Sequence, residues 1–480
     1  MYDVIIIGGG VVGSAAAYYL SQYDLKLLML EAFNDVADGT TKANSAVIHA
    51  GYDPKPGSLM AKYNVEGSKL TKELVKKLDV PYVNDGSLVL AFSPEDLETL
   101  KELYDRGIAN GVEQLKLLNY EETRDIEPGI SDNVYGSLYA GTSAVISPWE
   151  YCLALAETAV RNGMDLKLSN EVTGIRKNED GTFTVTTVKG EYQGRYVINA
   201  AGIYADKVHE MIGKKEFTIT PVRGQYFLLD KSQYPKAKHT LFQCPSERGK
   251  GVAVTPTVHG NLIVGPDATR VDGEDLDTTA DILSYVRETA SLSIKDIDYR
   301  ENIRNFSGLR ARSDRGDFII EESHSVPNFF NLAGMASPAL SSAAAIGVVA
   351  KDWVLSKQAY PKKEHYVDSR RKIRFKQLSD EEKNRIIKED PAYGRIICRC
   401  ETVTEGEIRA TFKTPIPPRS IDAVKRRTNA GMGRCQGGFC GERVAMILKE
   451  ELGLEYDEIL QDREGTVVLE KQAKEDYGNV

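Results

Sequence analysis

Four cysteines near the C-terminus have the residue type and spacing of a metal site. Cys398 and Cys400 form C-x-C, and Cys435 and Cys440 form C-x4-C after 34 intervening residues. Glycines around the second pair let a loop fold around an inorganic core, and a helix expected from Glu442 to Glu451 points its N-terminus at the thiolates. Four thiolates bind either a 2Fe-2S cluster or a tetrahedral zinc ion, and the spacing leaves both open.

A glycine-rich turn near the N-terminus is the second chemical motif. The strand expected from Asp3 to Ile7 leads into G-x-G-x-x-G, and a small-residue helix follows from Ser14 to Ser21. This order places a pyrophosphate on the helix N-terminus. A second strand, Leu25 to Leu30, ends where a carboxylate can accept hydrogen bonds from a ribose diol. We therefore predict a dinucleotide site formed by Gly8, Gly10, Gly13 and Glu31.

Three further segments favour FAD over NAD as the dinucleotide. A polar segment after the second strand offers donors to phosphates and to a ribityl chain, and the strand that starts at Tyr196 ends in small residues. A third strand, Phe329 to Ala333, opens into a small-residue helix whose N-terminus can face the polar edge of an isoalloxazine. Besides the motif itself, the residues predicted to contact FAD are Thr40, Thr41, Asn44, Ser45, Val172, Ala200, Gly202, Gly334, Ser337, Pro338 and Leu340.

The flavin bears on the choice of metal. No second G-x-G-x-x-G follows a strand, so one dinucleotide is expected. Zinc does no redox chemistry, whereas a two-electron flavin can feed a one-electron iron-sulfur carrier. We therefore predict FAD and a 2Fe-2S cluster, with zinc as the alternative metal.

Taken together, these motifs resemble the D-amino-acid-oxidase-like superfamily of flavoproteins. The segments that carry the resemblance cover about residues 1–356 and are MYDVIIIGGGVVGS, TTKANSAVIHAGYD, YVINAAGIYADK, VTPTVHGNLIVGP, GLRARS and GMASPALSSAAAIG. Within this superfamily the chain resembles the FAD-dependent glycerol-3-phosphate dehydrogenases and L-2-hydroxyglutarate oxidases. CRCETVTEGEI and GMGRCQGGFC resemble the bacterioferritin-associated-ferredoxin-like 2Fe-2S domain.

The fold class that this resemblance implies is α/β and α+β. A Rossmann-like FAD domain and a mixed-sheet substrate domain share residues 1–365, and a small helical four-cysteine iron-sulfur domain follows. The FAD-binding parts are about 1–80, 140–215 and 300–356, and the substrate-domain parts are about 81–139 and 216–299. Residues 366–392 form a charged linker and a helix capped by Ser379, 393–456 form the 2Fe-2S-binding domain, and 457–480 form a tail.

Oxidation of an alcohol by a flavin needs a base for the hydroxyl proton and a clamp for the anionic group of the substrate. We predict His49 as the base because an imidazole suits proton transfer near neutral pH, and contact with the flavin or packing is its alternative role. Arg310, in the GLRARS motif, is predicted to clamp the anion with its guanidinium fork. Further candidate substrate contacts are Arg223, His259 and Tyr52, and His259 also suits a hairpin turn.

The resemblance implies a dehydrogenase that oxidises sn-glycerol 3-phosphate to dihydroxyacetone phosphate. Electrons would leave through the cluster to a partner, either a separate flavoprotein or a quinone-linked subunit. The alternative substrate is L-2-hydroxyglutarate or another 2-hydroxy acid, which the segment Asn44–Tyr52 favours. Alternatives outside substrate oxidation are an electron-transfer or redox-sensing flavoprotein subunit and a zinc-stabilised interaction module.

Composition limits the other classes of function. The 480 residues include 61 Lys and Arg against 70 Asp and Glu, which argues against a nucleic-acid-binding surface over the whole chain. Six cysteines, four of them clustered, do not form the pattern of a disulfide-rich secreted domain. The longest apolar stretch, Ala339 to Leu355, is interrupted by charges and is expected to be too short to span a membrane. We expect a cytoplasmic protein that reaches a membrane only through a partner.

Overall fold

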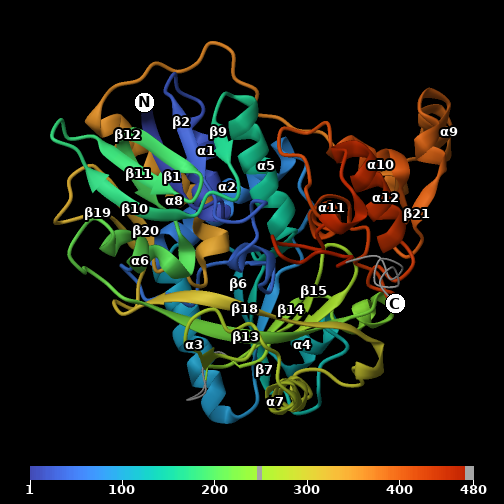
Figure 1. The fold of residues 1–480 in the computed structure, drawn as a ribbon. Coiled ribbons are helices and arrows are strands. Elements are labelled where there is room, and N and C mark those ends of the chain that lie inside the picture. The colour runs from blue at the N-terminus through green and yellow to red at the C-terminus, as the bar shows by residue number, and fades with distance from the viewer. Residues whose placement is uncertain (246–250, 471–480) are drawn as a thin grey trace, which may run out of the picture.

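The computed structural model describes residues 1–245 and 251–470 of the chain. Two large β-sheets with their helices form the body of the molecule, and a small C-terminal domain packs against its side (Figure 1). The expected combination of an α/β part, a mixed-sheet part and a small helical domain is confirmed.

The first sheet is eight-stranded and holds the N-terminal strand near its centre. β20, β12, β1, β2 and β9 run parallel, and antiparallel pairing adds β19 and the β10–β11 hairpin. Because parallel strands end at one edge of a sheet, the segments that follow β1, β2, β12 and β20 meet there. The strands are β1 (Tyr2–Ile7), β2 (Leu27–Leu30), β9 (Asp165–Lys167), β10 (Val172–Lys177), β11 (Phe183–Thr187), β12 (Gly190–Asn199), β19 (Ile319–Glu322) and β20 (Phe329–Ala333).

Helices pack closely beside this sheet because small residues line their contacts. A Cβ on Gly347 of α8 would lie 2.7 Å from the backbone of Ala15 in α1, and a Cβ on Gly67 of α2 would lie 2.3 Å from the carbonyl oxygen of Ser341. Only glycine permits such approaches, and they bring three helices into one buried layer. The helices of this part are α1 (Val11–Leu20), α2 (Leu59–Lys77), α5 (Pro148–Arg161), α6 (Ala205–Glu210) and α8 (Ala339–Lys357), with short 3-10 turns η1 (Thr40–Lys42) and η2 (Gly202–Tyr204).

α8 corrects one expectation from the sequence. The helix continues to Lys357 and has 19 residues, so by length and composition it could cross a membrane, and it is the one such helix among the described residues. More than half of its most apolar window is buried inside the protein, against α1 and α2. A core helix passes the same test of length and composition, and this packing is that of a core helix.

The second sheet is nine-stranded and mixed, with β5 and β14 parallel and its other pairs antiparallel. β13 and β18 form its longest antiparallel pair, so residues 302–313 belong to this sheet. Its elements are β5 (Ser87–Ala91), β6 (Leu115–Asn119), β7 (Gly136–Ala140), β13 (Ile219–Leu229), β14 (Thr240–Gln243), β15 (Val254–Pro256), β16 (Leu262–Val264), β17 (Thr269–Arg270), β18 (Asn302–Ser313), α3 (Pro94–Ala109), α4 (Tyr120–Ile126), α7 (Ala280–Ala290), η3 (Lys231–Lys236) and η4 (Tyr299–Glu301). A small sheet of β3 (Val47–Ile48), β8 (Ala144–Ile146) and β4 (Tyr82–Val83) lies apart from both large sheets.

The C-terminal domain has a hydrophobic core of its own, which includes Ile408, Val424, Val444 and Leu448. Capping boxes start two of its helices, Ser379 with Glu382, as expected from the sequence, and Thr404 with Glu407. Figure 1 shows this domain beside α5 and the β14–β15 region of the second sheet. Its elements are η5 (Phe375–Gln377), α9 (Asp380–Glu389), η6 (Pro391–Gly394), β21 (Ile396–Cys398), β22 (Val403–Thr404), α10 (Glu405–Thr411), α11 (Ile421–Thr428), α12 (Gly441–Leu452) and η7 (Tyr456–Glu458).

Candidate functional site

The nucleotide turn has the close contacts that its glycines predict. Gly8 has φ +107°, and a Cβ there would lie 2.5 Å from the carbonyl oxygen of Ala200. A Cβ on Gly13 would lie 2.1 Å from the carbonyl oxygen of Gly8, so helix, turn and strand end touch one another. Gly10 differs, because a Cβ there would make only ordinary contact, 3.5 Å from Oγ1 of Thr41. Gly10 therefore leaves room beside the N-terminus of α1, where a pyrophosphate binds.

Glu31 lies beside this turn at the carboxyl end of β2. Its carboxylate accepts hydrogen bonds from the backbone N–H of Gly9 at 2.6 Å and of Phe33 at 2.9 Å. Burial raises the pKa of Glu31 to about 7, although both hydrogen bonds act in the opposite direction. The carboxylate thus holds the glycine turn and stands where the sequence places the ribose diol.

The polar segment after β2 connects the turn to the second sheet. Oγ1 of Thr41 accepts a hydrogen bond from the backbone N–H of Val11 at 3.0 Å, at the start of α1. Thr40 donates its hydroxyl to the carbonyl oxygen of Leu309 in β18 at 2.6 Å. Asn44 donates to the carbonyl oxygens of both threonines and shapes this bend. Ser45 follows in a half-buried position.

The remaining predicted FAD contacts gather at the same sheet edge, with one exception. Ala200 and Gly202 follow β12, and Gly334, Ser337, Pro338 and Leu340 follow β20 into α8. Gly202 has φ +59° and Gly334 has φ +67°, conformations that favour glycine. Val172 lies in β10, buried in a hydrophobic cluster with Ile7 and Leu30. The arrangement fits a dinucleotide at the carboxyl ends of parallel strands, and the individual contacts stay predictions.

His49 lies at the boundary between the two large sheets. Its Nε2 is 3.3 Å from Oγ of Ser337, and its backbone N–H donates to Oγ of Ser341 in α8 at 2.8 Å. The imidazole ring stacks on Phe242 of β14 with centroids 5.6 Å apart. Asn64 donates its side-chain amide to the carbonyl oxygen of His49 at 2.6 Å. These contacts fix the imidazole between the start of α8 and the substrate sheet; the sequence predicts neither Phe242 nor Asn64 as a neighbour of His49.

The two candidate arginines of the second sheet project from opposite faces. Arg310 lies opposite Val222 in the β13–β18 register, whereas Arg223 lies opposite Leu309. Arg310 donates from Nη2 to the carbonyl oxygen of Asp267 at 3.1 Å, and its Nη1 is buried without a hydrogen-bond partner among the described residues. A guanidinium with an unsatisfied buried N–H suits an anion clamp.

Local contacts set Arg310 apart from Arg223. On the Arg310 face, a Cβ on Gly308 would lie 1.9 Å from the carbonyl oxygen of Ala43, so this face meets the segment of predicted FAD contacts. Arg223 is buried and pairs with Asp275 at 2.5 Å, and its Nε is likewise buried without a hydrogen-bond partner among the described residues. The sheet thus separates the two guanidinium groups, and the Arg310 face is the one that borders the predicted flavin site.

Tyr52 and His259 lie in different surroundings and do not line one substrate pocket. Tyr52 is buried in a hydrophobic cluster with Leu100 and Leu103, and burial raises its pKa. His259 lies in the turn of the β15–β16 hairpin, as its alternative role predicts. Its ring stacks on Trp149, and its Nδ1 is 3.1 Å from the side-chain amide nitrogen of Asn429 in the C-terminal domain. His259 is therefore part of a domain interface.

The four cysteines converge in two pairs. Sγ of Cys400 lies 3.8 Å from Sγ of Cys435. Cys440 hydrogen-bonds to Cys398, and this bond lowers the pKa of Cys398 to about 6 and raises that of Cys440. A Cβ on Gly433 would lie 2.2 Å from Cβ of Cys400, so glycine is required for the approach of the two loops.

Their spacing distinguishes the two candidate metals. Around one tetrahedral zinc, all four sulfurs lie about 3.8 Å from one another. No three of these four sulfurs lie mutually within 4.8 Å, since in the described part of the chain only Glu216, Glu321 and His324 meet that criterion. Two separate thiol pairs suit two irons, each held by two thiolates, so the donor set fits a 2Fe-2S cluster.

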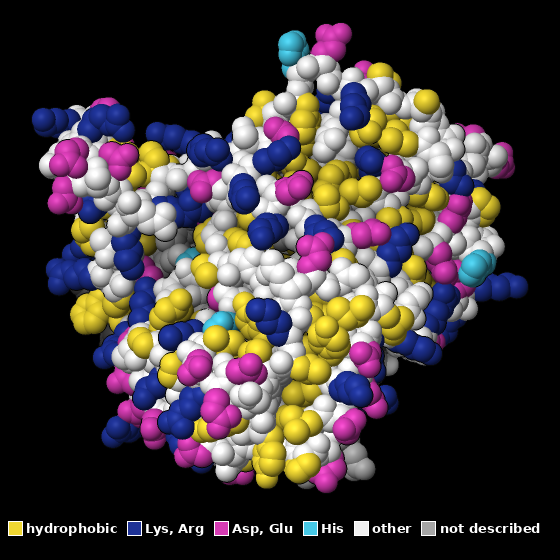
Figure 2. All heavy atoms as spheres, turned by 180° about the vertical axis from the view of Figure 1, so that it is seen from behind, with side chains coloured by type: hydrophobic (Ala, Val, Ile, Leu, Met, Phe, Trp, Pro, Cys, Tyr) yellow, Lys and Arg dark blue, Asp and Glu magenta, His cyan; other side chains and the backbone are white. Residues whose placement is uncertain are grey.

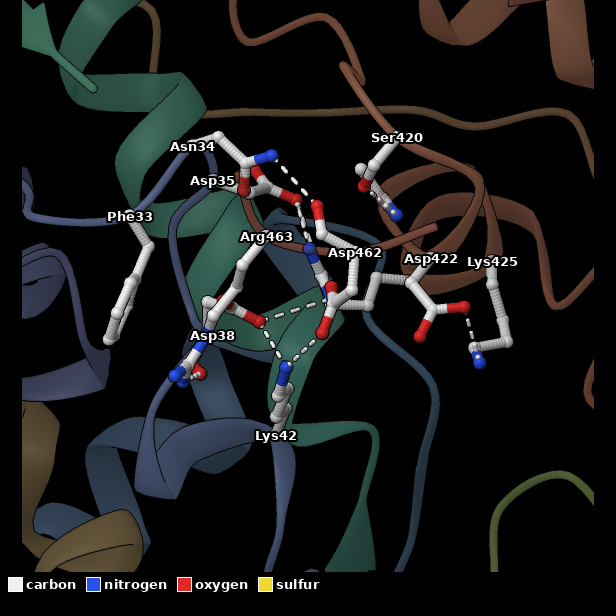
Figure 3. Close-up of polar contacts among 12 residues, drawn as sticks. Phe33, Asn34, Asp35, Asp38, Lys42, Ser420, Asp422, Lys425, Asp462 and Arg463 are labelled. Carbon is white, nitrogen blue, oxygen red and sulfur yellow. Dashed lines mark hydrogen bonds and ion pairs between the residues drawn. The ribbon is translucent and has the colours of Figure 1, made fainter. Parts of the chain in front are cut away.

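A buried ion-pair network holds the C-terminal domain to the loop that follows Glu31. Asp35 accepts hydrogen bonds from Arg427 at 2.8 Å, and Arg463 donates to Asp38 at 2.7 Å. Figure 3 shows Lys42 and Asp38 of this loop directed toward Asp462 and Arg463 of the C-terminal segment. The guanidinium of Arg463 also lies 3.6 Å from the ring centroid of Phe33. Sequence analysis missed this contact and assigned these C-terminal residues to a tail.

Comparisons with known proteins agree with both sites. Residues 3–353 match the family model described as FAD dependent oxidoreductase, and residues 396–450 match the BFD-like 2Fe-2S binding domain. A glycerol 3-phosphate dehydrogenase of Caloramator mitchellensis is 49% identical over 472 residues, 98% of each chain. A glycerol 3-phosphate oxidase of Mycoplasma pneumoniae is 36% identical over 74% of this chain and 96% of its own. The FAD-bound, dithionite-reduced L-alpha-glycerophosphate oxidase of that organism superposes with a TM-score of 0.74 at 35% identity, over 77% of this chain and 98% of the other.

Proposed function

Because this chain belongs to the FAD dependent oxidoreductase family and carries a BFD-like 2Fe-2S binding domain, we propose that it oxidises sn-glycerol 3-phosphate to dihydroxyacetone phosphate. The observation that carries the proposal is the position of His49, held by Ser337 at the start of α8 and stacked on Phe242 of the second sheet. Similarity to a glycerol 3-phosphate dehydrogenase along nearly the whole chain supports this substrate.

The reaction divides between the chain and its flavin. When bound, FAD supplies the acceptor for the hydride from C2 of the substrate. The hydroxyl proton at C2 passes to Nε2 of His49, and Oγ of Ser337 holds this nitrogen until the substrate hydroxyl takes its place. Loss of one hydride and one proton converts the secondary alcohol into a ketone.

Arg310 is proposed to bind the phosphate group. Its guanidinium presents a buried Nη1 that has no hydrogen-bond partner among the described residues, on the sheet face that also carries Gly308, next to the FAD-side segment. A doubly hydrogen-bonding fork holds a tetrahedral oxyanion in one orientation, and this fixes C2 relative to His49. Arg223, on the opposite face and paired with Asp275, is the less favoured clamp.

The cluster is proposed to carry electrons from the flavin to a partner protein, either a flavoprotein or a quinone-linked subunit. Two features support this direction of flow. Buried ion pairs hold the iron-sulfur domain against the FAD-side loop, and Cys400 is exposed. A cluster that buried contacts hold in place and that has an exposed ligand suits transfer between a fixed donor and an exchangeable acceptor.

Anaerobic absorbance spectroscopy tests the substrate. The enzyme as purified should show flavin and broad cluster absorbance, and glycerol 3-phosphate should bleach both, whereas L-2-hydroxyglutarate in a parallel cuvette should bleach neither. Bleaching by L-2-hydroxyglutarate alone would change the assigned substrate to a 2-hydroxy acid. The segment Asn44–Tyr52, which favours the alternative of a 2-hydroxy acid, agrees with that outcome. A flavin that only dithionite reduces would favour the electron-transfer subunit. His49→Asn is the matched control and should keep its FAD but bleach at least about a hundredfold more slowly.

A further inference from the structure

One large apolar side chain stands out beside the cysteine site. Phe439 is 85% exposed, the highest value among the large hydrophobic residues in the described chain. It directly precedes Cys440, whose own side chain is buried, so an apolar ring projects into solvent next to a cluster ligand. Burial of an aromatic ring is favourable, and aromatic anchors are enriched at the centres of protein interfaces.

Glycines flank Phe439 on both sides, so the backbone near it carries few side chains. Gly437 has φ +90°, which favours glycine at that position. Gly441, the first residue of α12, has no such conformation, and a Cβ there would meet nothing within 4 Å. Neither backbone geometry nor packing inside this chain therefore requires glycine at position 441. A missing side chain does permit another surface to approach the backbone beside Cys440, and it shortens the path from the cluster to that surface.

Unpaired positive charges flank the same loop. Arg399 lies between the first two cysteines, and Arg443 lies in the first turn of α12. Both are exposed, and neither forms an ion pair with any described residue. Other arginines of this domain differ, since Arg395 and Arg409 pair with glutamates. Glu442 is the one exposed acidic residue in this loop and turn, residues 435–443.

The excess of positive charge is local to the cysteine loops. Residues 375–470, which form the folded domain, contain 16 Lys and Arg against 18 Asp and Glu, whereas Arg399 and Arg443 are exposed beside the cysteines. Figure 2 shows Lys and Arg side chains along the flank that this domain occupies, at the left of that view. Arg399 and Arg443 thus form a local basic patch beside the cysteines, and such a patch attracts an acidic partner.

We propose that the cluster-side surface, formed by Arg399, Cys400, Phe439, Gly441 and Arg443, docks an acidic one-electron carrier protein. Phe439 anchors the contact, Gly441 admits close approach, and the two arginines select and orient the partner. This inference rests on the proposed exit of electrons through the cluster. Each substrate molecule oxidised releases two electrons, and two carrier molecules accept one electron each.

Complex formation tests the surface without turnover. The probes are ferricytochrome b5, which is acidic, and ferricytochrome c, which is basic, each titrated calorimetrically into the oxidised full-length holoenzyme. The enzyme should bind ferricytochrome b5 at low salt and release it at high salt, because the Debye length falls from about 30 Å at 0.01 M to about 3 Å at 1 M. Arg399→Glu with Arg443→Glu should weaken binding about tenfold, and Phe439→Ala should weaken it at all salt concentrations.

The control has the same change in net charge at a distant place. Lys101 in α3 and Lys189 in the β11–β12 turn are exposed and form no ion pair with described residues. Figure 1 shows α3 and the β11 region away from the C-terminal domain. The double variant K101E/K189E should bind ferricytochrome b5 within about twofold of the wild type. Equal weakening in both double variants, or preferential binding of ferricytochrome c, would overturn the proposal.

Electron transfer is tested with enzyme that light and a deazaflavin have reduced, so that no substrate is needed. Reduced wild type should transfer electrons to ferricytochrome b5, R399E/R443E should do so about tenfold more slowly, and ferricyanide should accept electrons from both at equal rates. The proposed substrate can thus be refuted while the proposal of this docking surface is supported. Conversely, unchanged rates in R399E/R443E and F439A would reject the surface even if glycerol 3-phosphate bleaches the flavin.

Discussion

Replacing Asp35 by asparagine should detach the C-terminal domain from the FAD-side loop. Asp35 is almost fully buried and accepts hydrogen bonds from Nη1 and Nη2 of Arg427 at 2.8 Å and from Nη2 of Arg426 at 3.0 Å. Burial alone would raise the pKa of Asp35, but the charges and hydrogen bonds of the two arginines outweigh it and hold the pKa below its usual value. The carboxylate therefore stays ionised above about pH 4, and its contribution is lost as the pH falls through the lowered pKa.

The magnitude follows from the balance of charge in the network. Four anionic groups face four cationic groups, namely Asp35, Asp38, Glu274 and Asp462 against Lys42, Arg426, Arg427 and Arg463. Asp35→Asn leaves one positive charge buried without a counterion. Removal of one partner from a buried pair costs about 3–5 kcal/mol. An exposed pair of similar length, Lys69 with Glu113 at 2.7 Å, has side chains 61% and 65% exposed, so solvent screens its attraction and it contributes little to stability.

Trp149 provides the assay. The chain has two tryptophans, and Trp149 stacks on His259, which contacts the C-terminal domain through Asn429. In a Trp353→Phe background, urea titrations of tryptophan fluorescence therefore report on this interface. D35N should lower the free energy of the first transition by about 3–5 kcal/mol, and the control Glu113→Gln should leave it nearly unchanged.

A rescue variant separates charge balance from packing. Asp35→Asn combined with Arg427→Met removes one charge of each sign and should regain at least about half of the loss, since apolar replacement of a buried pair is often tolerated. Equal losses in D35N and E113Q would refute the reasoning from burial. Failure of the combined variant to recover any stability would refute the reasoning from charge balance.

Three further outcomes are expected. His49→Asn should lower kcat for glycerol 3-phosphate by about 10² or more with its flavin content unchanged, and a loss under about threefold would place the base elsewhere. Burial lowers the pKa of His259 to about 4 from 6.5, against the charge of Glu150, so its share of docking stability is complete above about pH 6.5 and falls by roughly 3 kcal/mol as the pH drops toward 4. Fluorescence of Trp149 between pH 4.5 and 7.5 should show this slope, and His259→Phe should flatten it. Cys440→Ser should remove iron and cluster absorbance but leave flavin bleaching by substrate, and a loss of bleaching would mean that the cluster is needed for the flavin chemistry itself.

The sequence was sufficient to predict those parts of the structure that depend on residues close together in the chain. The glycines at 8, 10 and 13 predict a nucleotide turn because the backbone conformation of a turn depends on residues close together in the sequence. The helix cap at Ser379 was predicted for the same reason. The paired cysteines also predicted a metal site, since the type of the ligands and their short spacing are given by the sequence itself.

Strand register decided on which face of the sheet each arginine lies. The sequence predicted Arg310 as the clamp from its motif and Arg223 as a further candidate contact, but it did not place either side chain on a face. A side chain changes face with every residue along a strand, so the β13–β18 pairing places the two guanidinium groups on opposite sides. The pairing of four thiols into two separate groups, which favours two irons over one zinc, likewise required the loops in their folded positions.

The sequence by itself thus determined that the chain has a dinucleotide site and a four-cysteine metal site, and the tertiary structure decided how the two parts that carry them are joined. Asp35 and Arg427 are nearly 400 positions apart, and no periodicity or motif links residues at such separation. His259 was readable as a turn residue, but its contact with Asn429 exists only because the C-terminal domain docks against the hairpin. Because these charged side chains are buried, their ion pairs hold the two parts of the chain together. Burial is a property of the folded chain that local residue patterns do not specify.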